Sequence, residues 1–193
     1  MKNKFNRRKI LILLCFLIGA WQLSYSGYLY AKASVAQYLI LSAWNQSIED
    51  QTDVKPWSWA DTWPVARLVV PAHDEDMIVL AGDSGHALAF GPGHRLGSAM
   101  PGENGNTVIS AHRDTHFQFL QHLKKGDEIV LQNANGKTHS YLVQRVKIVD
   151  QSTPLYSDET QTQLTLVTCF PFNTLEVGGR LRYVVTARKI QKV

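Results

Sequence analysis

Three side chains in the C-terminal half of the chain, Cys169, His112 and Arg182, are of the types that together perform acyl transfer. A thiolate attacks a carbonyl carbon, whereas the neutral thiol, with an ordinary pKa of ~8.5, does so poorly, and a nearby cation favours the thiolate. An imidazole gives a proton to a leaving amine and takes one from an incoming amine, and a guanidinium stabilises the developing oxyanion. The set is sufficient for this chemistry, although residue types and spacing alone do not bring the three side chains together.

Each of these residues lies in or next to a segment with the pattern of a β-strand. Because side chains alternate along a strand, the Cys169 thiol is expected to reach the surface where the run 164–169 stops. His112 directly follows the run 107–111 and begins a polar turn. Arg182 alternates with the apolar positions of its strand, and an arginine is not placed in a core without a partner.

Residues 65–193 predict a small β-barrel. The pair Asn135-Gly136 predicts a hairpin turn, and only residues 117–124 have the pattern of a helix. Eight short strands and one helix indicate a closed or nearly closed barrel. The predicted strands are 67–70, 77–81, 87–90, 107–111, 128–132, 138–149, 164–169 and 180–187.

The basic charge of the protein is concentrated at its N-terminus. The 193 residues include 20 Lys and Arg against 16 Asp and Glu, and five of the basic residues lie within the first nine positions. Beyond that tail 15 basic residues face 16 acidic ones, so nucleic-acid binding is not expected. The hydrophobic share of 45% is that of a globular protein and excludes a disordered or polytopic membrane protein.

Residues 10–31 carry no charge and predict a transmembrane signal-anchor. Their 22 positions, at about 1.5 Å per residue, span a hydrocarbon layer of roughly 30 Å. The positive-inside rule places the basic tail 1–9 in the cytoplasm and the rest of the chain outside. We therefore expect a single-pass protein of the inner (cytoplasmic) membrane, with its folded domain on the periplasmic or extracellular side. The alternative is a signal peptide cleaved after Ala33, but the apolar core of a signal peptide is usually ~7–15 residues long.

The two cysteines, Cys15 and Cys169, belong to different regions of the chain. Cys15 falls inside the predicted membrane segment, so it cannot form an intramolecular disulfide with Cys169. An unpaired thiol is unusual in an exported domain and marks Cys169 as a candidate nucleophile. The alternative is a small buried hydrophobic residue.

Residues 32–64 form a connector between the membrane segment and the barrel. Residues 32–50 lack Gly and Pro and predict a helix that ends before Gln51. Residues 55–64 contain two prolines and cannot be a regular helix. Three tryptophans of this stretch are expected to pack on the domain, with a membrane-interface or lid role as the alternative: Trp57, Trp59 and Trp63.

Three segments together resemble the sortase family. Residues 165–169 (TLVTC) have the form of the sortase TLxTC signature, and residues 106–113 (NTVISAHR) are similar to the segment around the sortase histidine. Residues 182–185 (RYVV) are similar to the segment that bears the sortase arginine. The order His, Cys, Arg agrees as well, and the resemblance covers residues 65–188.

This resemblance implies a fold and an activity. The fold would be an eight-stranded sortase-like β-barrel with one or two short helices, after an N-terminal transmembrane helix. The activity would be that of a cysteine transpeptidase, which cleaves an LPXTG-like C-terminal sorting signal of an exported protein through a thioacyl intermediate on Cys169. His112 would act as acid and base, Arg182 would hold the oxyanion, and an amine would accept the acyl group, with water as the fallback.

Two further segments refine the resemblance. Residues 55–68 (KPWSWADTWPVARL) and 112–117 (HRDTHF) look most like the sortases of Gram-negative, often marine, bacteria. Ala111 stands where many sortases have glycine, which is a small-for-small change. No acidic cluster beyond Glu103 and Asp114 resembles the calcium site of some sortases, so neither a metal nor a cofactor is expected.

Neighbouring residues compete for the same roles. His94 lies in a Gly- and Pro-rich loop and is expected to be a loop or groove contact, whereas His116 is expected to be solvated. Arg180 has the strand parity of Arg182, but it follows two glycines and is expected in a loop. Thr168, beside the nucleophile, is either a substrate contact or part of the strand packing. The candidate substrate-binding residues are thus Thr168, His94 and Arg180.

Asp114 also has two possible roles. It could orient His112, but the simpler expectation is that Asp114 or Thr115 caps the predicted helix 117–124.

Two other classes of protein remain open on the sequence alone. A papain-like protease would need an Asn or Asp to orient its imidazole and would carry Cys upstream of His, the reverse of the order here. A non-catalytic, membrane-tethered binding barrel would explain the fold but would leave Cys169, His112 and Arg182 as coincidences.

Overall fold

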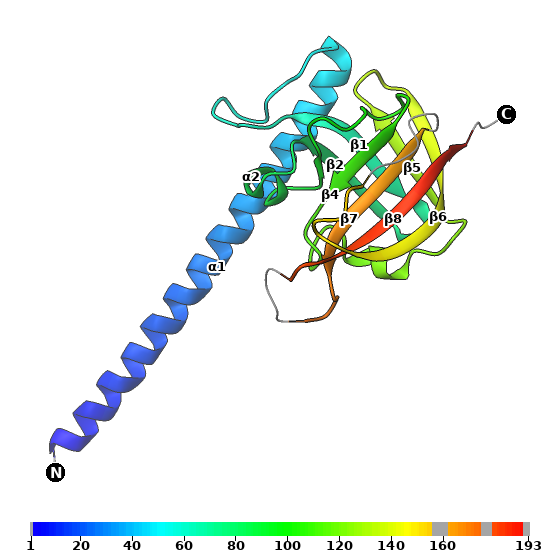
Figure 1. The fold of residues 1–193 in the computed structure, drawn as a ribbon. Coiled ribbons are helices and arrows are strands. Elements are labelled where there is room, and N and C mark those ends of the chain that lie inside the picture. Colours follow the sequence, from blue (N-terminus) through cyan, green and yellow to red (C-terminus); the bar gives the residue numbers. More distant parts are fainter. Residues whose placement is uncertain (1, 156–161, 175–178, 191–193) are drawn as a thin grey trace. The chain divides into compact units, whose positions relative to one another are not determined.

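The computed structural model describes residues 2–155, 162–174 and 179–190. The chain divides into two compact units, Met1–Tyr38 and Leu39–Val193. A single α-helix, α1 (Lys2–Asp50), makes up the first unit and continues into the second (Figure 1). Its apolar side chains from Ile10 to Tyr30 are exposed, and by length and composition the helix could cross a membrane.

The last part of α1 belongs to the second unit. Ile40 and Trp44 are only 2% and 1% exposed, and Ile40 packs against Leu80. After Asp50 the helix ends, and the Ser47 hydroxyl accepts a hydrogen bond from the backbone N–H of Val54 at 3.2 Å. The helix predicted for residues 32–50, with its end before residue 51, is confirmed.

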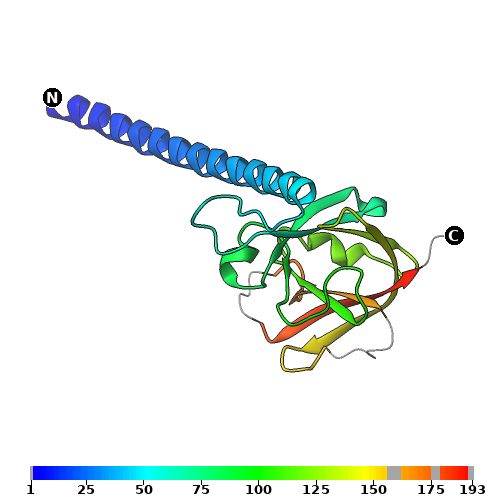
Figure 2. The same cartoon turned by 90° about the horizontal axis from the view of Figure 1, so that it is seen from above.

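Eight strands close into a barrel, as predicted, in the order β1-β2-β3-β4-β7-β8-β6-β5, with β5 pairing back to β1. Figures 1 and 2 show the barrel from two sides. The pairs β2–β3 and β4–β7 are parallel, and all other neighbours are antiparallel. The strands are β1 (Pro64–Val70), β2 (Glu75–Ala81), β3 (Gly93–His94), β4 (Asn106–Ser110), β5 (Glu128–Asn133), β6 (Thr138–Asp150), β7 (Gln163–Phe170) and β8 (Leu181–Ile190).

Side chains that alternate along β7 and β8 pack into two different apolar layers. The side chains that point inward join the barrel core, to which these strands contribute Leu164, Leu166, Val185 and Ala187. The opposite side chains build a smaller cluster on the outer face of the barrel, made of Val108, Val167 and Val184 with Val149 and Leu155 against them. By strand parity, Cys169 and Arg182 belong to this outer face.

The strand predicted for residues 87–90 is wrong. Residues 85–88 form a short helix, α2 (Gly85–Leu88), and Ala87 packs against the helix α1 residue Ile40 instead of joining the sheet. The eighth strand is β3, which pairs with the end of β2. Gly93 permits this close approach, because a Cβ at that position would lie 2.2 Å from the carbonyl oxygen of Gly82.

The predicted helix 117–124 is shorter and tighter than expected. A 3₁₀-helix, η2 (Gln118–His122), replaces it, and a further 3₁₀ turn, η1 (Pro71–His73), follows β1. Phe117 takes the N-cap position without a side-chain hydrogen bond, so the capping role expected of Asp114 or Thr115 is wrong. The Asp114 carboxylate is held by a neighbouring arginine, as described below.

The hairpin and the tryptophan connector agree with the prediction except at one position. The turn between β5 and β6 is present, and Gly136 adopts the positive φ of 75° that favours glycine. Trp57 packs edge-on against Phe90 with ring centroids 5.1 Å apart, and Trp63 packs against the barrel core. Trp59 is 83% exposed, so the expectation that it packs on the domain is wrong.

Candidate active site

The candidate nucleophile Cys169 and the candidate oxyanion partner Arg182 are direct cross-strand neighbours. Antiparallel pairing of β7 with β8 places Cys169 opposite Arg182. The Cβ atoms of residues in such positions lie roughly 4.5–5.5 Å apart, and the side chains point to the same face. Both residues are partly buried. The strand register therefore brings together two of the three residues selected from the sequence.

The third residue, His112, follows from the parallel register of β4 and β7. Asn106 lies opposite Gln163 and Ser110 opposite Val167, a constant separation of 57 residues. The same 57 residues separate His112 from Cys169. His112, Cys169 and Arg182 thus lie in one row across three neighbouring chain segments.

Two hydrogen bonds maintain this alignment beyond the end of β4. The backbone N–H of Ala111 donates to the carbonyl of Val167 at 3.2 Å. The Thr168 hydroxyl donates to the carbonyl of Ala111 at 2.7 Å. Ala111, the residue before His112, is thus bonded to Val167 and Thr168, the two residues before Cys169. The exposed segment that carries the His112 imidazole is therefore anchored to β7.

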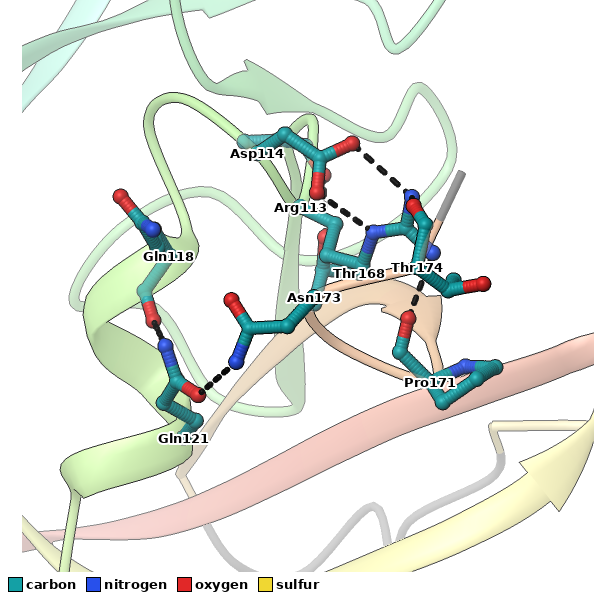
Figure 3. Close-up of polar contacts among 9 residues, drawn as sticks. Arg113, Asp114, Gln118, Gln121, Thr168, Pro171, Asn173 and Thr174 are labelled. Atoms are coloured by element: carbon teal, nitrogen blue, oxygen red, sulfur yellow. Dashed lines mark hydrogen bonds and ion pairs between the residues drawn. The ribbon is translucent and has the colours of Figure 1, made fainter. Parts of the chain in front are cut away.

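Arg113 was not selected from the sequence, yet it links the His112 segment to the chain that follows Cys169. Its side chain is only 8% exposed, and its guanidinium forms two hydrogen bonds with the carboxylate of Asp114, at 2.7 and 2.9 Å (Figure 3). It also donates to the carbonyls of Pro171 and Thr174, which precede β8 (Figure 3). The only sequence signal was its position after the candidate histidine, and an arginine in a polar turn is ordinarily solvated.

The charges around this link influence one another. The hydrogen bond to Asp114 is the main cause that raises the pKa of Arg113, and the nearby charge of Cys169 contributes in the same direction. The hydrogen bond from Arg113 is the main cause that lowers the pKa of Asp114, and His112 adds to the effect. Burial lowers the pKa of His116, and the charge of His112 lowers it further. Arg113, Asp114, His112 and His116 therefore form one electrostatic group beside the thiol.

Arg182 is held by neutral acceptors. It donates to the carbonyls of Gly179 and Leu181 at 2.6 and 3.0 Å, and to the side-chain oxygen of Gln151 at 3.0 Å. Arg180 instead forms an ion pair with Asp150 at 3.4 Å and is 74% exposed. The structure thus distinguishes the two arginines, because only Arg182 stands opposite Cys169.

The other two predicted substrate contacts have structural partners. Thr168 is 2% exposed and points to the face opposite to Cys169. His94 is 3% exposed, and its Nε2 lies 3.0 Å from both the carbonyl of Ala99 and the hydroxyl of Ser98. Their roles as substrate contacts stay predictions, and so does that of Arg180.

Two cavities adjoin the outer face of the barrel, and neither is lined by Cys169. The first has a volume of about 700 Å³ and lies over β4. It is lined by Arg95, Leu96, Gly97, Ser98, Ala99, Asn104, Gly105, Asn106, Val108, Pro154 and Leu155. The second, of about 670 Å³, lies over β6 and β8 and shares Asn106, Pro154 and Leu155 with the first. Within residues 2–155, 162–174 and 179–190, no group of three His, Cys, Asp or Glu side chains could hold a metal ion.

Comparisons with known proteins concern the family and the fold of the barrel. Residues 68–190 match the model of the sortase domain family. Sortase D of Bacillus subtilis is 30% identical over 125 residues, which cover 64% of this chain and 62% of that protein. The chain therefore spans less than two thirds of the length of this relative.

Solved structures extend the likeness to the fold. The structure of sortase C-1 from Actinomyces oris superposes with a TM-score of 0.60 at 27% identity, covering 67% of this chain and 74% of that one. A Clostridium perfringens sortase D5 transpeptidase gives a TM-score of 0.67 at 22% identity, covering 82% and 99%, and this likeness concerns the fold alone. With the family match spanning most of the barrel and the row of His112, Cys169 and Arg182 in place, this chain belongs to the sortase family.

Proposed function

We propose that the protein is a membrane-anchored cysteine transpeptidase that acts on an LPXTG-like sorting signal of exported proteins. The observation that carries this proposal is the row formed by His112, Cys169 and Arg182 at the ends of β4, β7 and β8. A non-catalytic binding barrel would have no need to align a thiol, an imidazole and a guanidinium in this way.

The chemistry proceeds in two steps. The thiolate Sγ of Cys169 attacks the carbonyl carbon of the signal's Thr, and the oxyanion that forms accepts hydrogen bonds from Arg182. The C–N bond to the next residue breaks while the imidazolium of His112 gives its proton to the leaving amine, which leaves a thioacyl group on Cys169. An amine then attacks the thioester, His112 takes its proton, and the thiolate departs. Water in place of the amine gives hydrolysis.

The first cavity fits the apolar part of the signal. Its walls include Leu96, Val108, Pro154 and Leu155, and Val108 also belongs to the valine cluster on the outer face that carries Cys169. An extended peptide whose Thr lies at Cys169 would place its preceding Leu and Pro along this face. Removal of the apolar surface of this Leu and Pro from water would supply binding energy there.

The proposed location follows from α1 and the basic tail. Residues 10–31 would anchor the protein in the inner membrane, and the barrel would act on the periplasmic or extracellular side. Residues 55–68 and 112–117 support the finer assignment to the sortases of Gram-negative bacteria. Protease added to intact spheroplasts would test this orientation, because only an outward-facing barrel is accessible.

The activity is tested with the full-length chain in detergent micelles and a peptide that contains an LPXTG-like motif. We expect mass spectrometry to show an acyl adduct on Cys169 and, with an added amine, a new amide product. Cys169→Ala should lose both while its thermal unfolding is unchanged, and Cys15→Ala is the matched control that keeps them. Turnover by Cys169→Ala above ~1% of wild type would overturn the nucleophile assignment, since loss of a nucleophile costs several powers of ten.

A further inference from the structure

The second cavity is basic. Among the residues that the structure describes, its lining contains no carboxylate and four cations, Lys125, Arg145, Lys147 and Arg188. All four are exposed, and none takes part in an ion pair with another residue that the structure describes. Cations from three parts of the fold therefore face one cavity without a compensating charge from the described part of the chain.

Three of these cations are arranged in order along the outer face, beginning from the row of Arg182. On β8, Val184 and Thr186 lie two and four residues beyond Arg182. They pair with Lys147 and Arg145 on β6. The sixth residue beyond Arg182 is Arg188 itself. At about 3.3 Å per strand residue, these positions lie roughly 7, 13 and 20 Å along the face from the catalytic row.

The shared wall of the two cavities sets the direction in which a bound substrate would run. Asn106, Pro154 and Leu155 line both cavities. In an LPXTG-like signal the apolar Leu and Pro precede the reacting Thr, so the chain would leave Cys169 through the first cavity. The Leu would lie about 10 Å from Cys169, and the residues before it would lie about 13 to 20 Å away, at the level of Arg145 and Arg188.

The geometry points to a subsite for acidic side chains that immediately precede the sorting signal in the substrate protein. This inference rests on the proposed function and adds a specificity to it. Carboxylates of the substrate would face Arg145, Lys147 and Arg188, while the scissile bond remains at Cys169. Because these cations are exposed, each pair contributes modestly and is screened by salt, and the preference arises from several charges acting together.

Synthetic peptides test the subsite with the full-length protein in a neutral detergent. Three peptides carry the same LPXTG-like motif, preceded by three Glu, three Gln or three Lys residues. We expect kcat/KM at low salt to be about three- to tenfold higher for the Glu peptide than for the Gln peptide, and lowest for the Lys peptide. The differences should shrink as salt approaches ~0.5 M, where the Debye length falls below the spacing of these charges.

Charge reversal in the protein provides the decisive comparison. The double variant Arg145→Glu/Lys147→Glu should reverse the order of the three peptides, so that kcat/KM is highest for the Lys peptide and lowest for the Glu peptide. Lys55→Glu/Lys137→Glu makes the same change in net charge at exposed positions outside the cavity and should keep the wild-type order. Equal kcat/KM for all three peptides would overturn the subsite but not the proposed function, whereas no cleavage of any peptide would overturn the function itself.

The chain's own carboxylates provide a last control. Asp158 and Glu159 follow Leu155 in the sequence. If the wild type showed no preference among the peptides and Asp158→Asn/Glu159→Gln preferred the Glu peptide, the cations would be assigned to the protein's own acidic residues. That result would overturn the proposal. A wild-type preference for the Glu peptide supports the subsite whatever this variant does.

Discussion

Arg113, which directly follows the candidate base His112, donates a hydrogen bond to the carbonyl of Pro171, two residues after the candidate nucleophile Cys169. The bond connects residues 58 positions apart in the chain. Together with the bond from Thr168 to Ala111, it fixes the separation of the two segments that carry the imidazole and the thiol. Arg113 is therefore a positioning residue in this arrangement.

Replacement of Arg113 should slow the reaction more than it weakens substrate binding. We expect Arg113→Ala to lower kcat by roughly 10- to 100-fold with a smaller change in KM, because misplacement of reacting groups by about 1 Å costs that much. Arg113→Lys should recover part of the rate, since one ammonium cannot reproduce the planar fork that joins Asp114 to two carbonyls. Steady-state kinetics and thermal unfolding of both variants measure this.

Arg67→Ala is the matched control for this prediction. Arg67 on β1 also forms an ion pair with a carboxylate, that of Asp76, with its Nε donating at 2.7 Å, but it lies outside the row of His112, Cys169 and Arg182 and lines neither cavity. If kcat were unchanged in Arg113→Ala and only the melting temperature fell, Arg113 would serve the fold alone.

Strand periodicity and spacing predicted most of the barrel and the alignment of the candidate residues His112 and Cys169. Seven of the predicted strands overlap the observed ones, and the 57-residue offset between His112 and Cys169 equals the register of β4 and β7. Alternation of apolar residues was a sufficient signal in these strands because one face of each is buried.

Features that depend on contacts between distant segments could not be predicted from the alternation of apolar residues. β3 has only two residues, and its place in the sheet depends on the close approach of Gly93 to Gly82. Ala87 and Phe90 are apolar because they pack in the cluster that contains Ile40 of α1, and not because they pair in a sheet. Arg113 has the sequence context of a solvated residue, and its burial results from carbonyls about 60 positions away in the chain.

Replacement of His112 by alanine should affect turnover, whereas replacement of His94 by alanine should affect stability. His112→Ala should abolish turnover and leave the melting temperature nearly unchanged, because the side chain is exposed. His94→Ala should lower the free energy of unfolding by about 1–3 kcal/mol, because the buried ring and its hydrogen bonds to the 98–99 turn are lost. Chemical denaturation paired with kinetics at 20 °C or below, where both variants stay folded, separates the effects.

If His94→Ala were inactive but as stable as the wild type, and His112→Ala were active, the roles assigned to these two residues would have to be exchanged. His116→Ala is the control for a histidine close to His112 in the structure, and it should retain most of the activity.

The stability of the barrel should fall as the pH drops below about 6.5, and His139 should contribute to this fall. Burial and the positive charges of Lys189 and Lys137 lower the pKa of His139 from its ordinary value of 6.5. The unfolded chain therefore binds a proton at a higher pH than the folded one, so protonation favours unfolding in the window that opens below 6.5. His139→Gln cannot take up this proton and should show a weaker pH dependence.

Urea denaturation at pH 7.5 and pH 5.5 measures this difference. His86→Gln is the control, because His86 is exposed and lies in α2, whereas His139 lies in β6. An identical loss of stability between the two pH values in wild type and His139→Gln would exclude a contribution from His139.

The last prediction concerns the two arginines that the sequence left as rivals. Arg182 stands opposite Cys169, and its donors already point toward neutral carbonyl and amide oxygens, so no carboxylate of the described residues competes with an oxyanion for them. Arg182→Ala should therefore lower kcat by roughly 10²–10³ with a smaller change in KM, as expected for a contact made in the transition state. Arg182→Lys should recover only part of that loss, because an ammonium lacks the planar fork. Arg180→Ala and Arg180→Lys should be mild, because Arg180 pairs with Asp150 at the surface. A loss of rate confined to position 180 would contradict the assignment by strand register, and full activity in all four variants would remove arginine from the mechanism.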